Sequence, residues 1–222
     1  MPKENPRTTF LCKQCGGETP KWLGRCPDCG EWNTLREVRQ DSSPRRRAGR
    51  GLISQPQELA TLVTTQGQRI PLPMPETNQV LGGGIVRGAT VLMAGDPGIG
   101  KSTLMLQIAA LLAARGQRAL YVSGEESSKQ VHLRAQRLCI DGQGLYFLPE
   151  TNIEAILEHM EVLAPEFAII DSIQTMYTDA ALSSAGSLAQ IRECTSRLIE
   201  WAKRSDTPIF IAGHVTKDGA VA

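Results

Sequence analysis

The residues Gly95-Asp96-Pro97-Gly98-Ile99-Gly100-Lys101-Ser102 decide the fold of this chain, because they fit the pattern G-x-x-x-x-G-K-[ST] in full. An apolar run at 89–94 precedes them, and the apolar residues from Thr103 onward predict a helix. A phosphate-binding loop has this order of strand, glycine-rich turn and helix N-terminus, where backbone N–H groups and the helix dipole meet phosphate oxygens. The sequence therefore predicts a nucleoside triphosphate site, and the flanking elements argue against a chance glycine-rich turn.

Two side chains of this loop have expected roles of their own. Lys101 reaches the β- and γ-phosphates, and Ser102 is an expected ligand of Mg²⁺. A nucleoside triphosphate and Mg²⁺ are thus the predicted ligands of this loop. The residues expected to surround the nucleotide are Gly95, Asp96, Pro97, Gly98, Ile99, Gly100, Lys101, Ser102 and Thr103.

Four of the six cysteines form two paired knuckles, Cys12-x₂-Cys15 and Cys26-x₂-Cys29, separated by ten residues. Paired knuckles of this kind bring four thiolates to one tetrahedral metal, and the natural occupant is Zn²⁺. Two disulfides are disfavoured beside a nucleotide enzyme in a reducing compartment, and a redox pair lacks its βαβ context. The other cysteines, Cys139 and Cys194, are expected to be small buried apolar residues.

Composition indicates an ordinary globular protein. The chain has 222 residues, 41% of them hydrophobic and 21% charged, with a net charge of +1. Any basic surface for nucleic acid must therefore come from local segregation of charge. The N-terminus lacks the apolar core of a signal peptide, and the most apolar stretch, 104–114, is too short to span a bilayer. We expect a cytoplasmic protein without a membrane partner.

Three segments are predicted along the chain. Residues 1–34 form a zinc-binding module that has too few apolar side chains for a core, so the metal must supply its folding free energy. Residues 35–57 are polar, arginine-containing and rich in breakers, which predicts a flexible basic linker. Residues 58–222 form an ATPase core in which strand and helix signals alternate, which predicts an α/β fold with a parallel sheet. The predicted strands are 89–94, 118–123, 144–148, 167–171 and 208–213, and the predicted helices are 102–114, 127–139, 152–163 and 187–204.

Acidic residues follow two of these strands. The strand 167–171 ends in Asp171, as in a Walker B segment whose carboxylate holds Mg²⁺ beside the phosphate loop. An aspartate in this place is also a common turn or helix cap. The next residue is Ser172 rather than glutamate, so the acid that orients the attacking water must lie elsewhere. Glu125 and Glu126 close the strand 118–123, although two glutamates also suit the first turn of a helix.

Together these residues resemble the RadA (Sms) family of bacterial DNA repair proteins, which are RecA-like ATPases. The resemblance covers essentially the whole chain and predicts a RecA-like P-loop core, incomplete at its end, preceded by the four-cysteine module. The segments that carry it, besides the loop 95–103, are 10–16, 20–34, Val80-Leu81-Gly82-Gly83-Gly84, Val122-Ser123-Gly124-Glu125-Glu126-Ser127, Glu150-Thr151-Asn152, Ile170-Asp171-Ser172-Ile173-Gln174-Thr175 and Gly213-His214-Val215-Thr216-Lys217.

The resemblance implies roles for residues that the pattern alone leaves open. It assigns orientation of the attacking water to Glu125, with Glu126 second. It also implies that strand 208–213 lies between the phosphate-loop strand and the Walker B strand, which makes His214 a sensor of the γ-phosphate. Lys101, Glu125, Asp171 and His214 are then the expected catalytic residues. The following loop, 215–220, matches a DNA-facing loop in position, with Lys217 as its one cation.

The implied activity is a Mg²⁺-dependent ATPase, stimulated by single-stranded DNA, that migrates branched intermediates of recombinational repair. The nucleotide implied by this resemblance is ATP. The implied partners are single-stranded or branched DNA and a RecA-type recombinase, and the full-length protein is expected to form a homo-oligomeric ring. A P-loop metabolic kinase is disfavoured by the zinc knuckles and by the glutamate after strand 118–123.

The alternative is a nucleotide- and DNA-binding module without significant turnover. It would bind through Lys21, Trp22, Arg25 and Trp32 of the zinc module. Packing of the two tryptophans over the metal site is the slightly favoured structural explanation for their presence.

The chain departs from the family pattern in two places. Asn78-Gln79 stand where the family usually has an Asp-Arg pair, which puts a salt bridge there in doubt. Further strands, a Lys-Asn-Arg-Phe-Gly motif and a Lon-protease-like domain are not found before Ala222, so the chain is expected to be a fragment. The phosphate-loop strand would then lie at a sheet edge. Hydrolysis would be slow if a missing cationic residue stabilises the transition state, since such a residue contributes about 10³–10⁵ in kcat elsewhere.

Overall fold

The computed structural model describes residues 8–14, 17–39, 58, 69–72 and 74–214. The chain divides into two compact units, Met1–Gly67 and Gln68–Ala222. Most of the predicted linker and the predicted start of the core lie outside the described residues, as do Cys15, Lys217 and the rest of the loop 215–220.

The first unit is a small antiparallel sheet with strand order β2-β1-β3. Its strands are β1 (Thr8–Cys12), β2 (Glu18–Thr19) and β3 (Leu35–Arg39). The sequence placed residues 35–39 in the linker, but they pair with β1 along its whole length. The boundary was missed because three of these five residues are charged, so the strand has no apolar alternation. Leu35 is buried beside the cysteines.

The second unit is built on a parallel sheet with strand order β4-β8-β7-β5-β6. Its strands are β4 (Thr90–Gly95), β5 (Ala119–Ser123), β6 (Leu145–Leu148), β7 (Phe167–Asp171) and β8 (Ile209–His214). The predicted parallel α/β fold is confirmed, and so is the insertion of the last strand between the phosphate-loop strand and the Walker B strand. In the described part of the chain, β4 lies at the edge, as expected.

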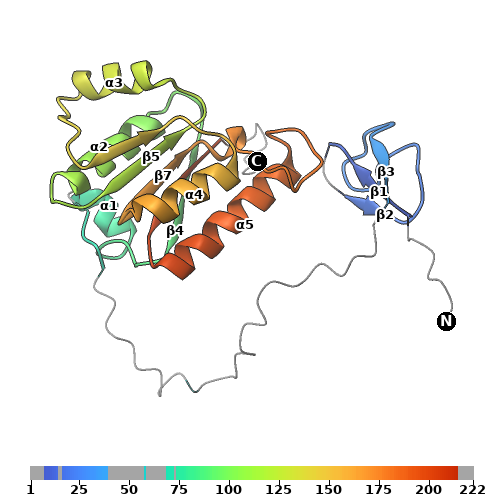
Figure 1. The fold of residues 1–222 in the computed structure, drawn as a ribbon, viewed down its shortest axis with the longest axis horizontal. Helices are drawn as coiled ribbons and strands as arrows, with labels where there is room; N and C mark the ends of the chain where they lie inside the picture. Colours follow the sequence, from blue (N-terminus) through green and yellow to red (C-terminus); the bar gives the residue numbers. More distant parts are fainter. Residues whose placement is uncertain (1–7, 15–16, 40–57, 59–68, 73, 215–222) are drawn as a thin grey trace. The chain divides into compact units, whose positions relative to one another are not determined.

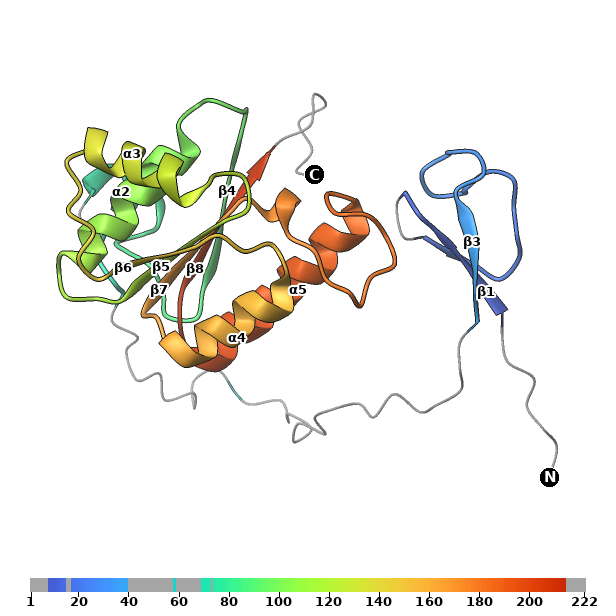
Figure 2. The ribbon, with the colours of Figure 1, turned by 45° about the horizontal axis from the view of Figure 1, so that its top comes forward.

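Helices cover both faces of this sheet (Figures 1 and 2). The helices are α1 (Pro75–Val80), α2 (Lys101–Ala113), α3 (Ser128–Arg137), α4 (Ile153–Leu163) and α5 (Leu188–Ser205). Polar side chains start three of them: Ser127, Asn152 and Ser187 each accept a hydrogen bond from the backbone N–H three residues later. Such caps satisfy amides that a helix N-terminus leaves without a partner.

Two apolar cores lie on the two sides of the sheet. Alternate residues of the central strands enter each core: Tyr121, Ile169 and Phe210 face α2, while Leu120 and Ile170 face α4 and α5. Since β5, β7 and the apolar part of β8 are buried on both faces, they appear in the sequence as continuous apolar runs.

The structure answers two sequence-based questions about this unit: whether its cysteines are buried, and what Asn78 contacts. Cys194 is buried as predicted, but Cys139 is exposed, because it follows α3 in a turn with φ of 56°. Asn78, where an acid was expected, accepts a hydrogen bond from Leu72 N at 2.7 Å and donates one to Leu72 O at 2.5 Å. An uncharged amide cannot form a salt bridge, and Asn78 instead bonds both backbone groups of Leu72. Within the described residues, no helix has the length and apolar character needed to cross a membrane.

The central strand provides a test of this packing. Replacement of Ile169, which is fully buried, by alanine is expected to lower the free energy of unfolding by about 2–5 kcal/mol through lost burial and a residual cavity. The matched control is Val162→Ala on α4, where the side chain is 86% exposed and the expected change is within about 0.5 kcal/mol. Urea denaturation followed by circular dichroism measures both. Equal effects of the two substitutions would contradict the described core.

Candidate nucleotide and metal sites

The glycine-rich loop connects the end of β4 to the start of α2. Gly98 and Gly100 have φ angles of 81° and 102°, in the left-handed region that a side chain disfavours. Both are exposed, and a Cβ at either position would meet no atom within 4 Å. Within the described part of the chain, their amide N–H groups make no hydrogen bond. The loop therefore has an open cradle of backbone donors, which is what a phosphate group requires.

Lys101 is a buried cation at the first position of α2. Its Nζ donates hydrogen bonds to the carbonyl oxygens of Gly95 at 2.7 Å and Asp96 at 2.9 Å. Among the residues that the structure describes, no carboxylate lies within ion-pair distance of it. A buried charge without a counterion is unfavourable, so the site fits an anionic phosphate.

Asp171 is the buried carboxylate that ends β7. It caps no helix: the residue that precedes the 3-10 helix η2 (Ile173–Thr175) is Ser172. Its Oδ2 accepts a hydrogen bond from the Tyr121 hydroxyl at 2.5 Å, and the described residues offer it no cationic partner within ion-pair distance. Together with the hydroxyl of Ser102 on α2, this carboxylate provides the oxygen donors that Mg²⁺ prefers.

Glu125 lies just beyond the end of β5, where two hydrogen bonds reach its Oε1. One comes from the Ser172 hydroxyl, and the other from His214 Nε2 at 3.2 Å. Desolvation is the largest single influence on its pKa and raises it, but the hydrogen bonds from Ser172 and His214, with the charges of His214 and Lys101, lower the pKa overall. Glu125 is therefore ionised at neutral pH, as a proton acceptor must be.

His214 lies between two charged side chains of the site, those of Lys101 and Glu125. Its Nδ1 lies 3.5 Å from Lys101 Nζ, and its Nε2 lies 3.2 Å from Glu125 Oε1. Because a carboxylate can only accept, the contact with Glu125 requires a proton on Nε2, while Nδ1 faces the Lys101 ammonium. The end of β8 is thus linked to the phosphate loop and to the end of β5.

Glu126, the second candidate for water orientation, lies in a different environment. Its Oε1 forms an ion pair with Arg134 of α3 at 2.5 Å. The preceding Gly124 leaves no room for a side chain, because a Cβ there would lie 2.5 Å from atoms of Thr151 and Thr175. This tight packing fixes the loop that carries both glutamates.

Three residues of the site, Tyr121, Ser172 and Arg134, were not predicted from the sequence. Tyr121 lies within an apolar strand, so its position gave no indication of a role. Its hydroxyl group could have indicated one, because a buried phenol needs a hydrogen-bond acceptor. Ser172 was noted only because it is not a glutamate, and its hydrogen bond to Glu125 depends on the pairing of β5 with β7.

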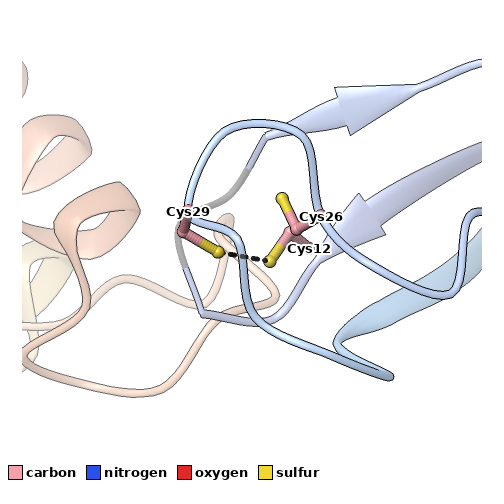
Figure 3. A group of neighbouring side chains, drawn as sticks. All are labelled: Cys12, Cys26 and Cys29. Atoms are coloured by element: carbon pink, nitrogen blue, oxygen red, sulfur yellow. Dashed lines mark hydrogen bonds between the residues drawn. The ribbon is translucent and has the colours of Figure 1, made fainter.

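Three of the four predicted zinc ligands come together in the first unit (Figure 3). The sulfurs of Cys12, Cys26 and Cys29 all lie within 4.8 Å of one another, and the Cys12 and Cys29 sulfurs are 3.7 Å apart. Two sulfurs bound to one tetrahedral zinc at about 2.3 Å are separated by about 3.8 Å. The donor set therefore fits zinc. The Thr34 hydroxyl, 3.2 Å from Cys12 Sγ, can donate to a thiolate.

The two tryptophans of this unit are largely open to solvent. Trp22 is 56% exposed and Trp32 is 68% exposed, so neither is buried in the small core beside the cysteines. The Arg25 guanidinium carbon lies 5.9 Å from the centroid of the Trp32 ring, and Arg25 Nε donates to Gly30 O at 2.6 Å. The module thus has exposed aromatic faces beside a cation.

Comparisons with known proteins found matches for both units of the chain. Residues 54–220 match the family described as an AAA domain, and residues 10–37 match one described as a rubredoxin metal binding domain. The DNA repair protein RadA of Listeria monocytogenes is 47% identical over 100% of this chain and 49% of its own length. For the DNA repair protein RadA of Bacillus subtilis, the identity is 45% over 97% of this chain and 48% of its own length. The chain thus spans about half the length of the curated relatives it matches.

A solved structure, that of a KaiC-like protein from Pyrococcus horikoshii, superposes with a TM-score of 0.56 at 20% identity. The match covers 67% of this chain and 72% of the other, and at this identity it supports the fold alone. The fold and the site define a RecA-like P-loop core preceded by a zinc ribbon. The chain belongs to the AAA domain family.

The metal site predicts a clear effect of single cysteine substitutions. Cys26→Ser and Cys15→Ser should lose zinc and the folded structure of the first unit, because its few apolar side chains cannot fold it without the metal. The matched control is Cys139→Ser, in the exposed turn after α3, which should keep the zinc of the wild type. Metal content after gel filtration, measured by plasma mass spectrometry, tests this. Full zinc in Cys26→Ser, or iron in place of zinc, would contradict the assignment.

Proposed function

We propose that this chain contains the nucleotide-hydrolysing core of a DNA repair ATPase that uses ATP and Mg²⁺. One observation carries the proposal: a buried cation, a buried carboxylate and a hydrogen-bonded glutamate meet beside an open phosphate loop. Lys101, Asp171 and Glu125 come from three different elements. A structural ion-pair network would pair the cation with the acid, whereas here Lys101 and Asp171 have no such partner in the described part of the chain.

The proposed division of roles follows from the contacts. The loop amides and Lys101 hold phosphates, and Ser102 and Asp171 hold the metal. When bound, Mg²⁺ would supply positive charge that offsets the negative charge developing on the phosphates during hydrolysis. Glu125 accepts the proton of the attacking water, since Ser172 and His214 keep its carboxylate ionised and oriented. His214, at the end of β8, relays the state of the nucleotide to the loop that follows it.

A role on DNA is proposed because the relatives are named DNA repair proteins. We propose stimulation by single-stranded DNA, action on branched recombination intermediates, association with a RecA-type recombinase and a ring of subunits for the longer protein. The exposed edge of β4, where Leu92 is open to solvent, supports a core that is covered by further structure in such a protein.

Two substitutions separate binding from turnover. Lys101→Ala should abolish binding of Mg·ATP, because the buried phosphate partner is lost. Glu125→Gln should keep binding within a few-fold and reduce hydrolysis by about 10²–10⁴, which is the usual contribution of a general base. The matched control is Lys129→Ala, an exposed lysine on α3 that should behave as wild type.

These effects are measured by titration with a fluorescent ATP analogue and by phosphate release, with and without single-stranded DNA. Undiminished hydrolysis in Lys101→Ala would show that the site is misplaced. If wild type and Glu125→Gln hydrolyse ATP at the same rate, the water is activated by another residue.

A second candidate function is supported by the exposed tryptophans: nucleotide and DNA binding without significant turnover. Trp22 and Trp32 present aromatic faces on which unpaired bases can stack, and Lys21 and Arg25 are exposed beside them. This function predicts DNA binding that depends on the first unit and not on Lys101.

The tryptophans can be tested directly. Trp22→Leu and Trp32→Leu should each weaken binding of oligothymidine by about 1–3 kcal/mol, the usual value of one base stacked on an aromatic ring. The control Leu23→Ala removes a neighbouring exposed apolar side chain without an aromatic face. Fluorescence anisotropy with oligothymidine and with an abasic strand of equal length measures stacking separately from phosphate contacts. Equal affinities of all variants would exclude the tryptophans from DNA binding.

A further inference from the structure

Tyr121 is a fully buried tyrosine whose hydroxyl lies at the proposed metal site. It occupies the middle of β5, opposite Ile169 of β7, and its ring stacks against Phe147 with centroids 6.3 Å apart. Strand pairing and ring packing hold the side chain in one place. Its phenol oxygen is therefore a fixed point in the core, close to the carboxyl edge of the sheet.

The phenol oxygen lies close to both residues proposed to bind Mg²⁺. It lies 2.5 Å from Asp171 Oδ2 and 3.4 Å from the backbone oxygen of Ser102. A phenol has a single proton to donate, and the much shorter contact assigns it to the carboxylate. The Asp171 side chain makes no other hydrogen bond within the described residues, so Tyr121 alone orients it there.

The Tyr121 hydroxyl suits this role because a phenol carries a proton that it can donate, whereas a carboxylate can only accept. A donor to one carboxylate oxygen leaves the other oxygen available, which is how outer partners of metal-binding carboxylates orient them.

We propose that Tyr121 is a positioning residue for Mg²⁺, acting by a hydrogen bond that fixes the carboxylate of Asp171 beside Ser102. This inference rests on the proposed function, because it assumes that the loop binds Mg²⁺ with a nucleotide. It adds a residue that the phosphate-loop and Walker B patterns do not contain. Tyr121 acts through Asp171 and need not contact the metal itself.

The test is Tyr121→Phe, which removes the hydroxyl and keeps the ring. We expect the Mg²⁺ concentration that gives half-maximal binding of a fluorescent, non-hydrolysable ATP analogue to rise about 10–100-fold, as for other outer partners of metal ligands. Affinity for the analogue in EDTA should stay at the wild-type value, since the phosphate loop is intact. The matched control is Tyr146→Phe on the neighbouring β6, where the ring is 46% exposed.

A second variant shows whether the hydroxyl acts through the carboxylate. Asp171→Asn should itself raise the Mg²⁺ requirement, and Tyr121→Phe should add little to it in that background. If the two effects multiply instead, Tyr121 acts by another route and the inference is wrong. Thermal unfolding of each variant is recorded alongside, because a loss of packing alone would weaken binding equally with Mg²⁺ and in EDTA.

The outcomes separate this inference from the proposed function. A wild-type chain that binds the analogue more tightly with Mg²⁺, together with a Tyr121→Phe variant that behaves identically, would overturn the role of Tyr121 only. A wild-type chain that does not bind the analogue, or binds it equally with Mg²⁺ and in EDTA, would overturn both.

Discussion

The register of the parallel sheet is the constraint on which the site depends. Backbone hydrogen bonds place Gly95 beside His214, and Ser123 beside Asp171, at the carboxyl ends of four adjacent strands. Because parallel strands end at the same edge, segments separated by up to 119 positions (95 to 214) supply one cluster of side chains. A shift of one residue in the pairing of β5 with β7 would turn Tyr121 or Asp171 to the opposite face of the sheet. The apolar cores on both faces resist such a shift.

The two units are stabilised by different physical means. In the second, apolar side chains from both faces of the sheet supply the stability, and this allows it to hold a buried lysine and a buried aspartate without ionic partners in the described part of the chain. These charges are unfavourable by themselves, and a bound phosphate and Mg²⁺ would relieve them. Among the described residues of the first unit, the buried apolar side chains are Cys12, Cys26 and Leu35, which are too few for a core, so three sulfurs gathered for one metal take its place.

Most of the fold could be predicted from the sequence because its elements are strongly marked. The apolar runs of β5 and β7 and the phosphate loop give clear signals, and the family resemblance supplied the place of β8 between β4 and β7. Leu35–Arg39 could not be recognised, because its pairing with β1 is a tertiary property. The hydrogen bonds around the site could not be predicted either. They join Tyr121 to Asp171 and Ser172 to Glu125, and these partners are 50 and 47 positions apart in the sequence. The exposure of Trp22 and Trp32 also could not be predicted, because it depends on the small size of the folded module.

If Lys101, Glu125, Asp171 and His214 form one catalytic site, a nucleotide binds among them at this edge of the sheet. A crystal structure of the chain with Mg²⁺ and a non-hydrolysable ATP analogue is the decisive experiment. It should show the terminal phosphate within hydrogen-bond distance of Lys101 Nζ, Mg²⁺ bound by Ser102 and held near Asp171 directly or through water, and a water between the phosphate and Glu125. A nucleotide bound elsewhere, or phosphates that do not contact Lys101 and the loop amides, would contradict this assignment of the site.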